Sequence, residues 1–214
     1  MKRVTKDPDV RREELIDVAE ELFLKNGYEE TPVSDIVKNA QVAQGTFYYY
    51  FKSKDEILDA LTDRYLNEFT GCVEKEVERD DNNAVEKMIN AFKCGSRFSL
   101  GRTKLMIYLH EEENSLLHLK MERKSHVLIV PLFAKMIEQG VIEGLFHVKY
   151  PYEAALLLVG CWDSLFDVEH FFAKSVEEKK KTIEAAFCIM ERVLGAKQGS
   201  FAEPFLNMEG VYET

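Results

Sequence analysis

Apolar residues recur at helical spacing along most of the chain. The first repeat consists of Leu15, Ile16, Ala19, Leu22 and Phe23. Positions with this spacing share one face of a helix. Asp7 followed by Pro8 gives that helix a favoured start, with an N-cap acceptor before a first-turn proline. Gly27 supplies a left-handed stop, so the first predicted helix ends there.

Two short apolar segments and a long one follow. A second helix begins after Thr31-Pro32 and is marked by apolar residues at Val33, Ile36, Val37 and Ala40. A third short helix is predicted over 44–51. Ser53 and Glu56 then form a capping box, in which the serine hydroxyl accepts a hydrogen bond from the Glu56 amide. The capping box predicts the start of a long fourth helix.

The rest of the chain is also helical in pattern. Helices are predicted over 83–95, 101–112, 115–139, 151–173 and 176–194. Pro131 should kink the third of these, because it removes an amide donor and crowds the preceding turn. No segment alternates in the manner of a strand, so the sequence predicts an all-α fold. The tail over 197–214 has little pattern and is left unassigned.

Net charge bears on the kind of partner. The 214 residues carry 28 basic and 38 acidic side chains, a net charge of −10. That total alone argues against nucleic acid, which favours basic surfaces. Residues 1–54, however, hold 9 Lys or Arg against 10 Asp or Glu. A DNA-binding face built from a few local cations and helix N-termini is therefore compatible with the composition.

Cysteine spacing and apolar run length indicate the compartment. Cys72, Cys94, Cys161 and Cys188 are far apart, with no Cys-x-x-Cys pair. We expect four reduced cysteines, no metal site and no cofactor. No apolar run approaches the roughly 20 residues of a membrane span, and the N-terminus lacks the apolar core of a signal peptide. A cytoplasmic protein without membrane contact is expected.

The second and third predicted helices, joined by a short turn, follow the helix-turn-helix plan, in which the second helix enters the major groove of DNA. Phe47, Tyr50 and Phe51 should point inward, and Tyr48 and Tyr49 outward. The residues suited to DNA contact are Gln44 and Thr46 for base edges, Gly45 for close backbone approach, Tyr48 and Tyr49 for phosphate oxygens, and Lys52 and Lys54 beside the start of the fourth helix.

The segment from Thr31 to Leu58, with its run Thr46-Phe47-Tyr48-Tyr49-Tyr50-Phe51 and its Ser53-Lys54 helix start, resembles the DNA-binding signature of the TetR family. The resemblance covers roughly residues 9–60. It implies that Gln44, Gly45, Thr46, Tyr48 and Tyr49 face double-stranded DNA, and that Thr31 and Lys54 hold phosphates. Two departures are Gln41, where the family usually has glycine, and Ala43, where it usually has a serine cap.

The resemblance also implies a domain plan. A helix-turn-helix domain would span 1–54, a connecting helix 55–71, a ligand-sensing and dimerisation domain 72–196, and a tail 197–214. The last two large helices would pair with those of a second subunit, so that a homodimer reads a palindromic operator. A small, largely apolar effector would release it. The candidate ligand-binding residues are Phe92, Met106, Tyr108, Met121, Trp162 and Phe166.

Two other functions fit a helical chain. Asp167 and His170 stand at i and i+3, as in a helical-bundle metal enzyme, but a di-iron bundle needs two Glu-x-x-His motifs and two further glutamates. No catalytic residue is assigned, and the chain is predicted not to be an enzyme. A DNA-free adaptor with the same fold is the second alternative. Each aromatic residue proposed for the ligand site also fits plain core packing.

Overall fold

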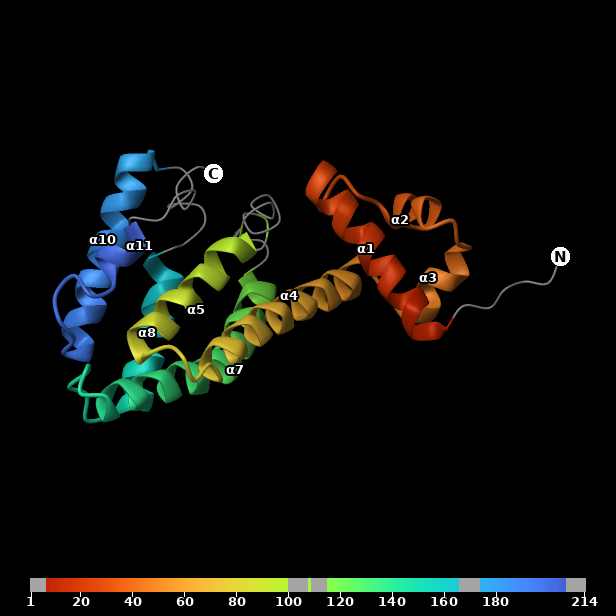
Figure 1. Cartoon of the computed structure of the whole chain (residues 1–214). Coiled ribbons are helices and arrows are strands. Elements are labelled where there is room, and N and C mark those ends of the chain that lie inside the picture. Colours follow the sequence, from red (N-terminus) through yellow and green to blue (C-terminus); the bar gives the residue numbers. More distant parts are fainter. Residues whose placement is uncertain (1–6, 100–107, 109–114, 166–173, 207–214) are drawn as a thin grey trace.

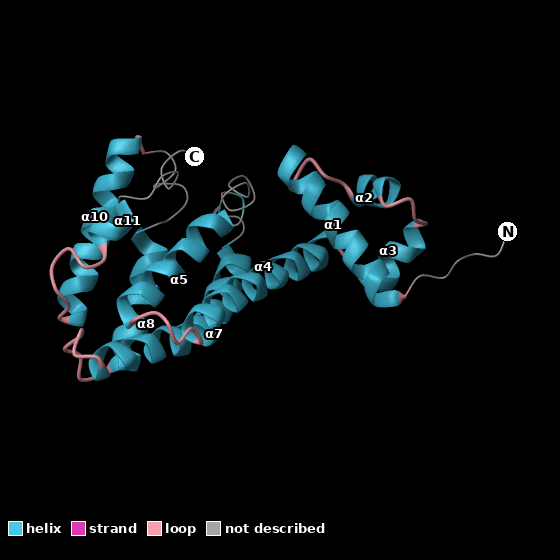
Figure 2. Ribbon diagram, viewed as in Figure 1, coloured by secondary structure: helices cyan, strands magenta, loops and turns pink. Residues whose placement is uncertain are grey.

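The computed structural model describes residues 7–99, 108, 115–165 and 174–206. All its regular elements within these ranges are helices, as predicted (Figure 2). They are α1 (Pro8–Asn26), α2 (Val33–Asn39), α3 (Gln44–Tyr50), α4 (Lys54–Val77), α5 (Ala84–Ser99), α7 (Ser115–Ile142), α8 (Pro151–Leu165), α10 (Val176–Leu194) and α11 (Ala202–Leu206). The predicted helix over 101–112 lies outside the described residues except for Tyr108.

The helix ends follow the predicted capping residues. The Asp7 carboxylate accepts from the Asp9 amide at 2.9 Å, and Gly27 ends α1 with φ 94°. At α10, Ser175 and Glu178 form a capping box with both of its hydrogen bonds present, and Gly195 ends the helix in the left-handed conformation. These local signals therefore fix where α1 and α10 begin and end.

Two bodies share α4, which runs from one into the other (Figure 1). The N-terminal body consists of α1, α2, α3 and the first part of α4, with Ile57, Leu58 and Leu61 buried in its core. The C-terminal body contains the remaining helices, and the last turns of α4 bury Val73 in that second core. A single rigid element thus belongs to both hydrophobic cores.

Ion pairs fasten α1 to α4 on the outside. Arg64 of α4 pairs with Asp17 at 2.6 Å and also with Glu20 and Glu13 of α1. The Tyr65 hydroxyl donates to Glu20 at 2.5 Å. Because one guanidinium serves three carboxylates, the pairs act as a network rather than as isolated surface bridges.

The C-terminal body is organised around α7, which packs against α8, α4 and α5. By length and composition, residues His118–Ile142 would be apolar enough to cross a membrane, which departs from the expectation that no such stretch exists. In the fold this helix buries Val130, Met136 and Ile137 completely. Burial inside the C-terminal body accounts for part of its apolar character. The helix continues through Pro131.

The tail beyond α10 contributes to the core, which the sequence pattern did not indicate. Phe201 is fully buried and its ring lies 6.0 Å from that of Phe146 and 6.4 Å from that of Phe187. Glu191, 3% exposed, accepts from the Phe201 and Gly199 amides at 2.9 Å each. A buried carboxylate therefore caps the backbone that leads into α11.

The expectation of four reduced cysteines is wrong for two of them. Cys72 of α4 and Cys94 of α5 form a disulfide, while Cys161 and Cys188 are free. The two bonded residues are 22 positions apart. The packing of α4 against α5 brings them together. The spacing of the cysteines along the sequence could not predict this pairing, because it depends on how the two helices pack.

Replacing Phe201 by alanine should lower the free energy of unfolding by about 3–5 kcal/mol, because a large buried ring is lost from a packed cluster. Chemical denaturation measures this. Lys197→Ala, an exposed change in the same tail, should stay within about 0.5 kcal/mol of the wild type. Equal stability of the two variants would show that the tail does not belong to the core.

Candidate nucleic-acid interface

A tight turn joins α2 to α3. α2 ends with Ala40 as its C-cap, and Gln41 follows with φ 53°. Among the described residues, Gln41 has a positive φ although it is not a glycine. The Val42 amide donates to the Val37 carbonyl at 3.1 Å, which closes the turn. A side chain in this left-handed conformation costs on the order of 1 kcal/mol relative to glycine. Gln41 therefore adopts the left-handed backbone conformation that favours glycine, the residue that the TetR family usually has at this position.

The start of α3 has no side-chain cap. Ala43 occupies the N-cap position in an extended conformation, and its methyl group accepts no hydrogen bond. A capping serine or threonine typically contributes about 1 kcal/mol. The first amides of α3 are therefore without a side-chain acceptor from the N-cap residue.

α3 has one buried and one exposed side. Phe47 is fully buried, and Phe51, just beyond the helix, is 1% exposed. Tyr48 is 50% and Tyr49 76% exposed, as the pattern predicted. Tyr50 is half-buried against the same core. The two buried rings fix the rotation of α3, and this rotation directs Tyr48 and Tyr49 to solvent.

Gln44, Gly45 and Thr46 lie on the same exposed edge. Gln44 and Gly45 are exposed and Thr46 is half-buried. Gly45 has an ordinary helical φ, and a Cβ added to it would meet no atom within 4 Å. Neither backbone conformation nor packing within the chain requires a glycine here. We name the residues Gln44, Gly45, Thr46, Tyr48 and Tyr49, which are exposed or half-buried, the α3 edge.

The two lysines predicted for phosphate contact differ in their surroundings. Lys52 is exposed, and its backbone amide donates to the Glu56 carboxylate at 2.5 Å. The Lys54 ammonium folds back over the Tyr28 ring, 4.0 Å from its centroid, and donates to the Tyr28 carbonyl at 2.8 Å. It also lies 4.0 Å from the Glu29 carboxylate. In this conformation the charge of Lys54 is used within the protein.

The capping box at the start of α4 forms with one change. The Ser53 hydroxyl accepts from the Glu56 amide at 3.1 Å, as expected. Glu56 reaches back to the amide of Lys52 rather than to that of Ser53. The pair still fixes the entry into α4, beside the exposed lysine.

The structure does not support the predicted phosphate contact of Thr31. Its side chain is completely buried, and its hydroxyl donates to the Gly27 carbonyl at 2.7 Å, with a longer contact to the Leu22 carbonyl at 3.4 Å. A hydroxyl with no solvent access cannot reach a phosphate. Thr31 joins the end of α1 to the start of α2 instead, and we remove it from the interface.

A cluster at the corner between α1 and α2 supports Lys54. The Tyr28 hydroxyl donates to Asp55 at 2.5 Å. Burial, and to a smaller extent this hydrogen bond, raises the pKa of the Tyr28 phenol. Tyr108 packs its ring 4.6 Å from that of Tyr28 and donates to Glu29 at 3.1 Å. A residue far along the chain thus contacts the N-terminal body directly.

The candidate ligand-binding residues do not gather around one cavity in the described part of the chain. Phe92 belongs to the C-terminal core, 5.6 Å from the Phe133 ring. Tyr108 and Met121 pack against the N-terminal core instead. Met106, Phe166 and the side chain of Trp162 lie outside the described residues. Helical periodicity identified apolar faces but not which of the two cores each face joins.

An open groove does lie between α4 and α7. Its volume is about 450 Å³, and it is lined by Asp63, Leu66, Asn67, Arg123, Lys124, Val127 and Leu128. None of the predicted ligand-binding residues is among them. Lys124 and Lys120 of α7 pair with Asp63 and Asp59 of α4 along its side.

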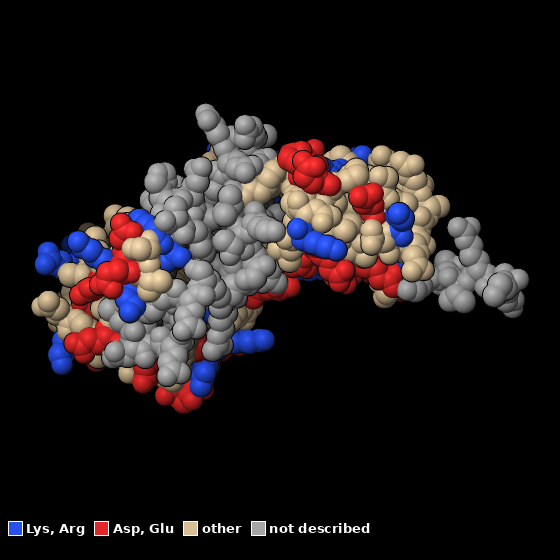
Figure 3. Space-filling view, turned by 90° about the horizontal axis from the view of Figure 1, so that it is seen from above, with Lys and Arg blue, Asp and Glu red and all other residues tan. Residues whose placement is uncertain are grey.

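The surface shows no single basic patch on the face drawn in Figure 3, where acidic and basic side chains are interspersed over the N-terminal body. This agrees with the near-neutral charge of that segment. Contact with a polyanion would depend on a few side chains and on backbone amides rather than on a broad electrostatic field.

Comparison with known proteins identifies the family. The profile described as "Bacterial regulatory proteins, tetR family" matches residues 15–61, and that described as "Tetracyclin repressor-like, C-terminal domain" matches residues 105–192. Together the two profiles cover more than half of the chain. This chain belongs to the TetR family. The profile matched to residues 15–61 includes the whole turn and α3 edge.

The chain is also similar to individual known proteins. The Fatty acid metabolism regulator protein of Bacillus subtilis is 38% identical over 87 residues, which cover 41% of this chain and 43% of that protein. The aligned part thus spans less than half of that relative's length. Fatty acid degradation regulator FadR from Bacillus halodurans superposes with a TM-score of 0.64 at 22% identity, covering 91% of this chain and 98% of that one. The reduced form of E. coli NemR gives a TM-score of 0.63 at 18% identity, with 88% and 99% covered. At these identities, the two structures establish the fold alone.

Thr31→Val should lower the free energy of unfolding by about 1–3 kcal/mol, because it keeps the shape but leaves buried carbonyl oxygens without their donor. Thermal or urea unfolding measures the change. Ser34→Ala, an exposed neighbour, is the matched control and should alter stability by less than about 0.5 kcal/mol. If Thr31→Val were as stable as that control, the buried hydrogen bonds of Thr31 would not contribute to the free energy of unfolding.

Proposed function

We propose that this chain is a cytoplasmic, DNA-binding transcriptional regulator, a repressor that leaves a palindromic operator when a small, largely apolar ligand binds. The observation that carries the proposal is the α3 edge: an exposed row of hydrogen-bonding groups on a helix whose opposite side is locked into a core by Phe47 and Phe51. Membership of the TetR family supports the same function.

Each residue of the α3 edge has a chemical role in this proposal. The Gln44 amide suits the adenine edge in the major groove, and the Thr46 hydroxyl suits either a base or a phosphate. Tyr48 and Tyr49 present hydroxyls on rigid rings to phosphate oxygens, and Lys52 adds an exposed cation beside α4. Gly45 lets the DNA backbone come close, which explains a glycine that the fold does not need.

Lys54 would bind phosphate only after leaving its internal partners. Its ammonium must give up the Tyr28 carbonyl and the Glu29 carboxylate. A phosphate placed at the N-terminus of α4 gains from both the ammonium and the helix dipole. We therefore assign Lys52 as the phosphate contact that is available in the free protein. Lys54 would become a phosphate contact only when DNA binding separates its ammonium from its internal partners.

A homodimer is part of the proposal, because a palindromic site needs two recognition helices about 34–36 Å apart. α8 and α10, which pack on each other, leave large apolar side chains uncovered. Tyr152 is 52%, Leu156 45% and Ile189 52% exposed. Burying such residues against the same helices of a second subunit removes apolar area from water.

The proposed domain plan follows the original boundaries: DNA binding over 1–54, a connecting helix over 55–71, sensing and dimerisation over 72–196, and the tail over 197–214. Linkage supplies the mechanism. A ligand that binds better to the form with mis-spaced recognition helices lowers operator affinity by the same coupling factor. The names of two relatives, both concerned with fatty acids, make acyl compounds the first ligands to test.

Lys52→Ala should weaken binding to all DNA sequences and flatten the dependence of log K on log salt by about one unit per subunit, because one phosphate contact is lost. Fluorescence anisotropy with a DNA fragment from the promoter of the protein's own gene, at several salt concentrations, measures the affinity and the salt slope. Lys25→Ala removes the same charge from an exposed position at the end of α1 and should leave the slope unchanged. Identical slopes for the two variants would refute the assigned phosphate contact.

Gly45→Ala should stabilise the free protein by about 0.5–1 kcal/mol, since alanine is the better helix former and its methyl group meets no neighbour. The same variant should bind the promoter fragment at least tenfold more weakly. A more stable protein with weaker binding separates a contact role from a folding defect. Unchanged affinity would mean that the DNA backbone does not approach this position.

Two outcomes favour the alternatives named earlier. Stoichiometric iron or manganese in the purified protein would favour a helical-bundle metal enzyme, although Asp167 and His170 lie outside the described residues. Failure of every promoter fragment to bind at low salt would favour a DNA-free adaptor.

A further inference from the structure

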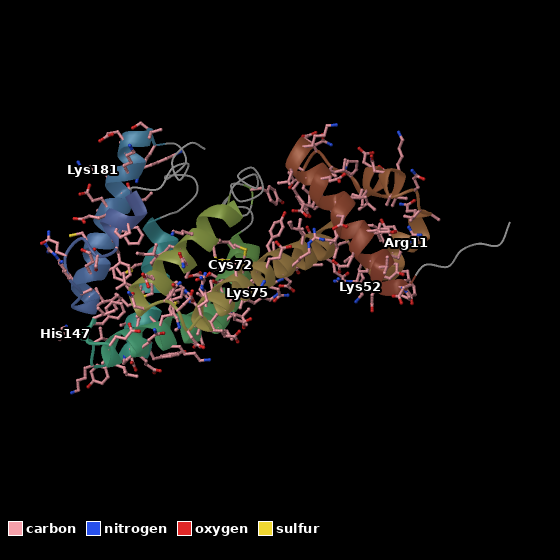
Figure 4. The ribbon with its side chains drawn as sticks, viewed as in Figure 1. Arg11, Lys52, Cys72, Lys75, His147 and Lys181 are labelled. Atoms are coloured by element: carbon pink, nitrogen blue, oxygen red, sulfur yellow. A yellow bond between two sulfur atoms is a disulfide. The ribbon has the colours of Figure 1, made fainter. Side chains whose placement is uncertain are left out.

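A second chemical feature lies away from the α3 edge, where α4 crosses α5. The sulfur atoms of Cys72 and Cys94 are 2.00 Å apart and their Cα atoms 6.1 Å apart, and Figure 4 labels Cys72 beside its sulfur in the C-terminal body. Bacterial cytoplasm keeps thiols reduced, and disulfides found there are usually transient. If the protein works in that compartment, as proposed, this pair alternates between two states.

The two helices are held together without the disulfide. The Lys87 ammonium of α5 donates to the Val77 carbonyl of α4 at 2.8 Å, and the Asn90 amide donates to the Glu76 carboxylate at 3.0 Å. Beside Cys94, a Cβ added to Gly95 would lie 3.6 Å from the Phe69 ring of α4. Reduction would therefore leave the two thiols facing each other, ready to close again.

The two cysteine residues differ in their exposure to solvent. Cys94 is 8% exposed, whereas Cys72 is half-buried. Because a dissolved oxidant more readily reaches the less buried residue, we assign Cys72 as the attacking thiol and Cys94 as the resolving one. Cys161 and Cys188 are not part of the pair and remain free.

We propose that Cys72 and Cys94 form a reversible redox site for peroxides. The Cys72 thiolate attacks one peroxide oxygen and breaks the O–O bond, which yields a sulfenic acid; the leaving hydroxide or alkoxide takes up the proton that the thiol gave up and departs as water or alcohol. The Cys94 thiolate then attacks the Cys72 sulfur, which forms the S–S bond and breaks the S–O bond, and the leaving hydroxide takes up the Cys94 thiol proton and departs as water. Two thiols are oxidised and one peroxide is reduced. A cellular dithiol reverses the step by thiol–disulfide exchange.

The location of the site gives the oxidation a consequence that rests on the proposed function. The bond ties α4 to α5 close to the end of α4, and the other end of α4 carries Lys54. Tyr108 contacts Tyr28 and Glu29, the residues around Lys54. Because the bond joins α4 to α5, it restrains the helix that carries Lys54 in the arrangement in which the Lys54 ammonium is held internally. Reduction leaves α5 packed on α4 but removes this covalent restraint, so Lys54 leaves its internal partners more readily for a phosphate.

The first experiment tests the chemistry alone. Full-length protein reduced with dithiothreitol should show four free thiols, in line with its four cysteines, and should lose two on stoichiometric hydrogen peroxide. Peptide mapping should join Cys72 to Cys94, and dithiothreitol should restore both thiols in the folded protein. In Cys94→Ser, a dimedone adduct should form at Cys72. A disulfide that never forms with peroxide, or that the folded protein never releases, overturns the proposal.

The second experiment tests the consequence with the promoter fragment. Reduced protein should bind at least threefold more tightly than oxidised protein, with a steeper salt slope. Cys94→Ser should show the reduced affinity under both treatments. Equal affinity of the two wild-type states, or tighter binding by the oxidised one, overturns the link to DNA. A reversible disulfide in a protein that binds no promoter fragment in either state would instead overturn the proposed function and leave the redox site standing.

Discussion

The arrangement of the molecule depends on one helix belonging to two hydrophobic cores. α4 buries Ile57, Leu58 and Leu61 among α1–α3 and Val73 among the helices of the C-terminal body. A helix is stiff over this length, so its two ends cannot turn independently. Arg64 and its three acidic partners on α1 add a polar attachment near the middle. Any event that shifts α4 in the C-terminal core must therefore shift the N-terminal body as well.

The α3 edge inherits its orientation from that constraint. Phe47 and Phe51 pack into the core that α4 completes, so the rotation of α3 is set by buried apolar area and not by its own short length. The uncapped start at Ala43 and the left-handed Gln41 each cost on the order of 1 kcal/mol. The short recognition segment is thus stabilised from behind by its packing, while the side that faces solvent is free to carry function.

Contacts around Lys54 join the two bodies in a second way. Tyr108 lies beyond α5 in sequence, yet its ring and hydroxyl hold the corner between α1 and α2. Lys54 sits on the same corner. The proposed DNA face thus depends on α4, which the Cys72–Cys94 bond joins to α5, and on the contacts of Tyr108. In a chain with a net charge of −10, the placement of a single cation has more weight than it would have on a broadly basic surface.

The sequence by itself determined the helical class, the bounds of α1 and α10, the turn between α2 and α3, and the inward and outward sides of α3, because these depend on capping residues and on periodicity within one segment. Only the tertiary structure decided what depends on contacts between segments. It buried the Thr31 hydroxyl, turned Lys54 inward, joined Cys72 to Cys94 and brought Phe201 into the core. It also separated Phe92 from Tyr108 and Met121, since an apolar stripe shows that a helix face is covered but not by which neighbour.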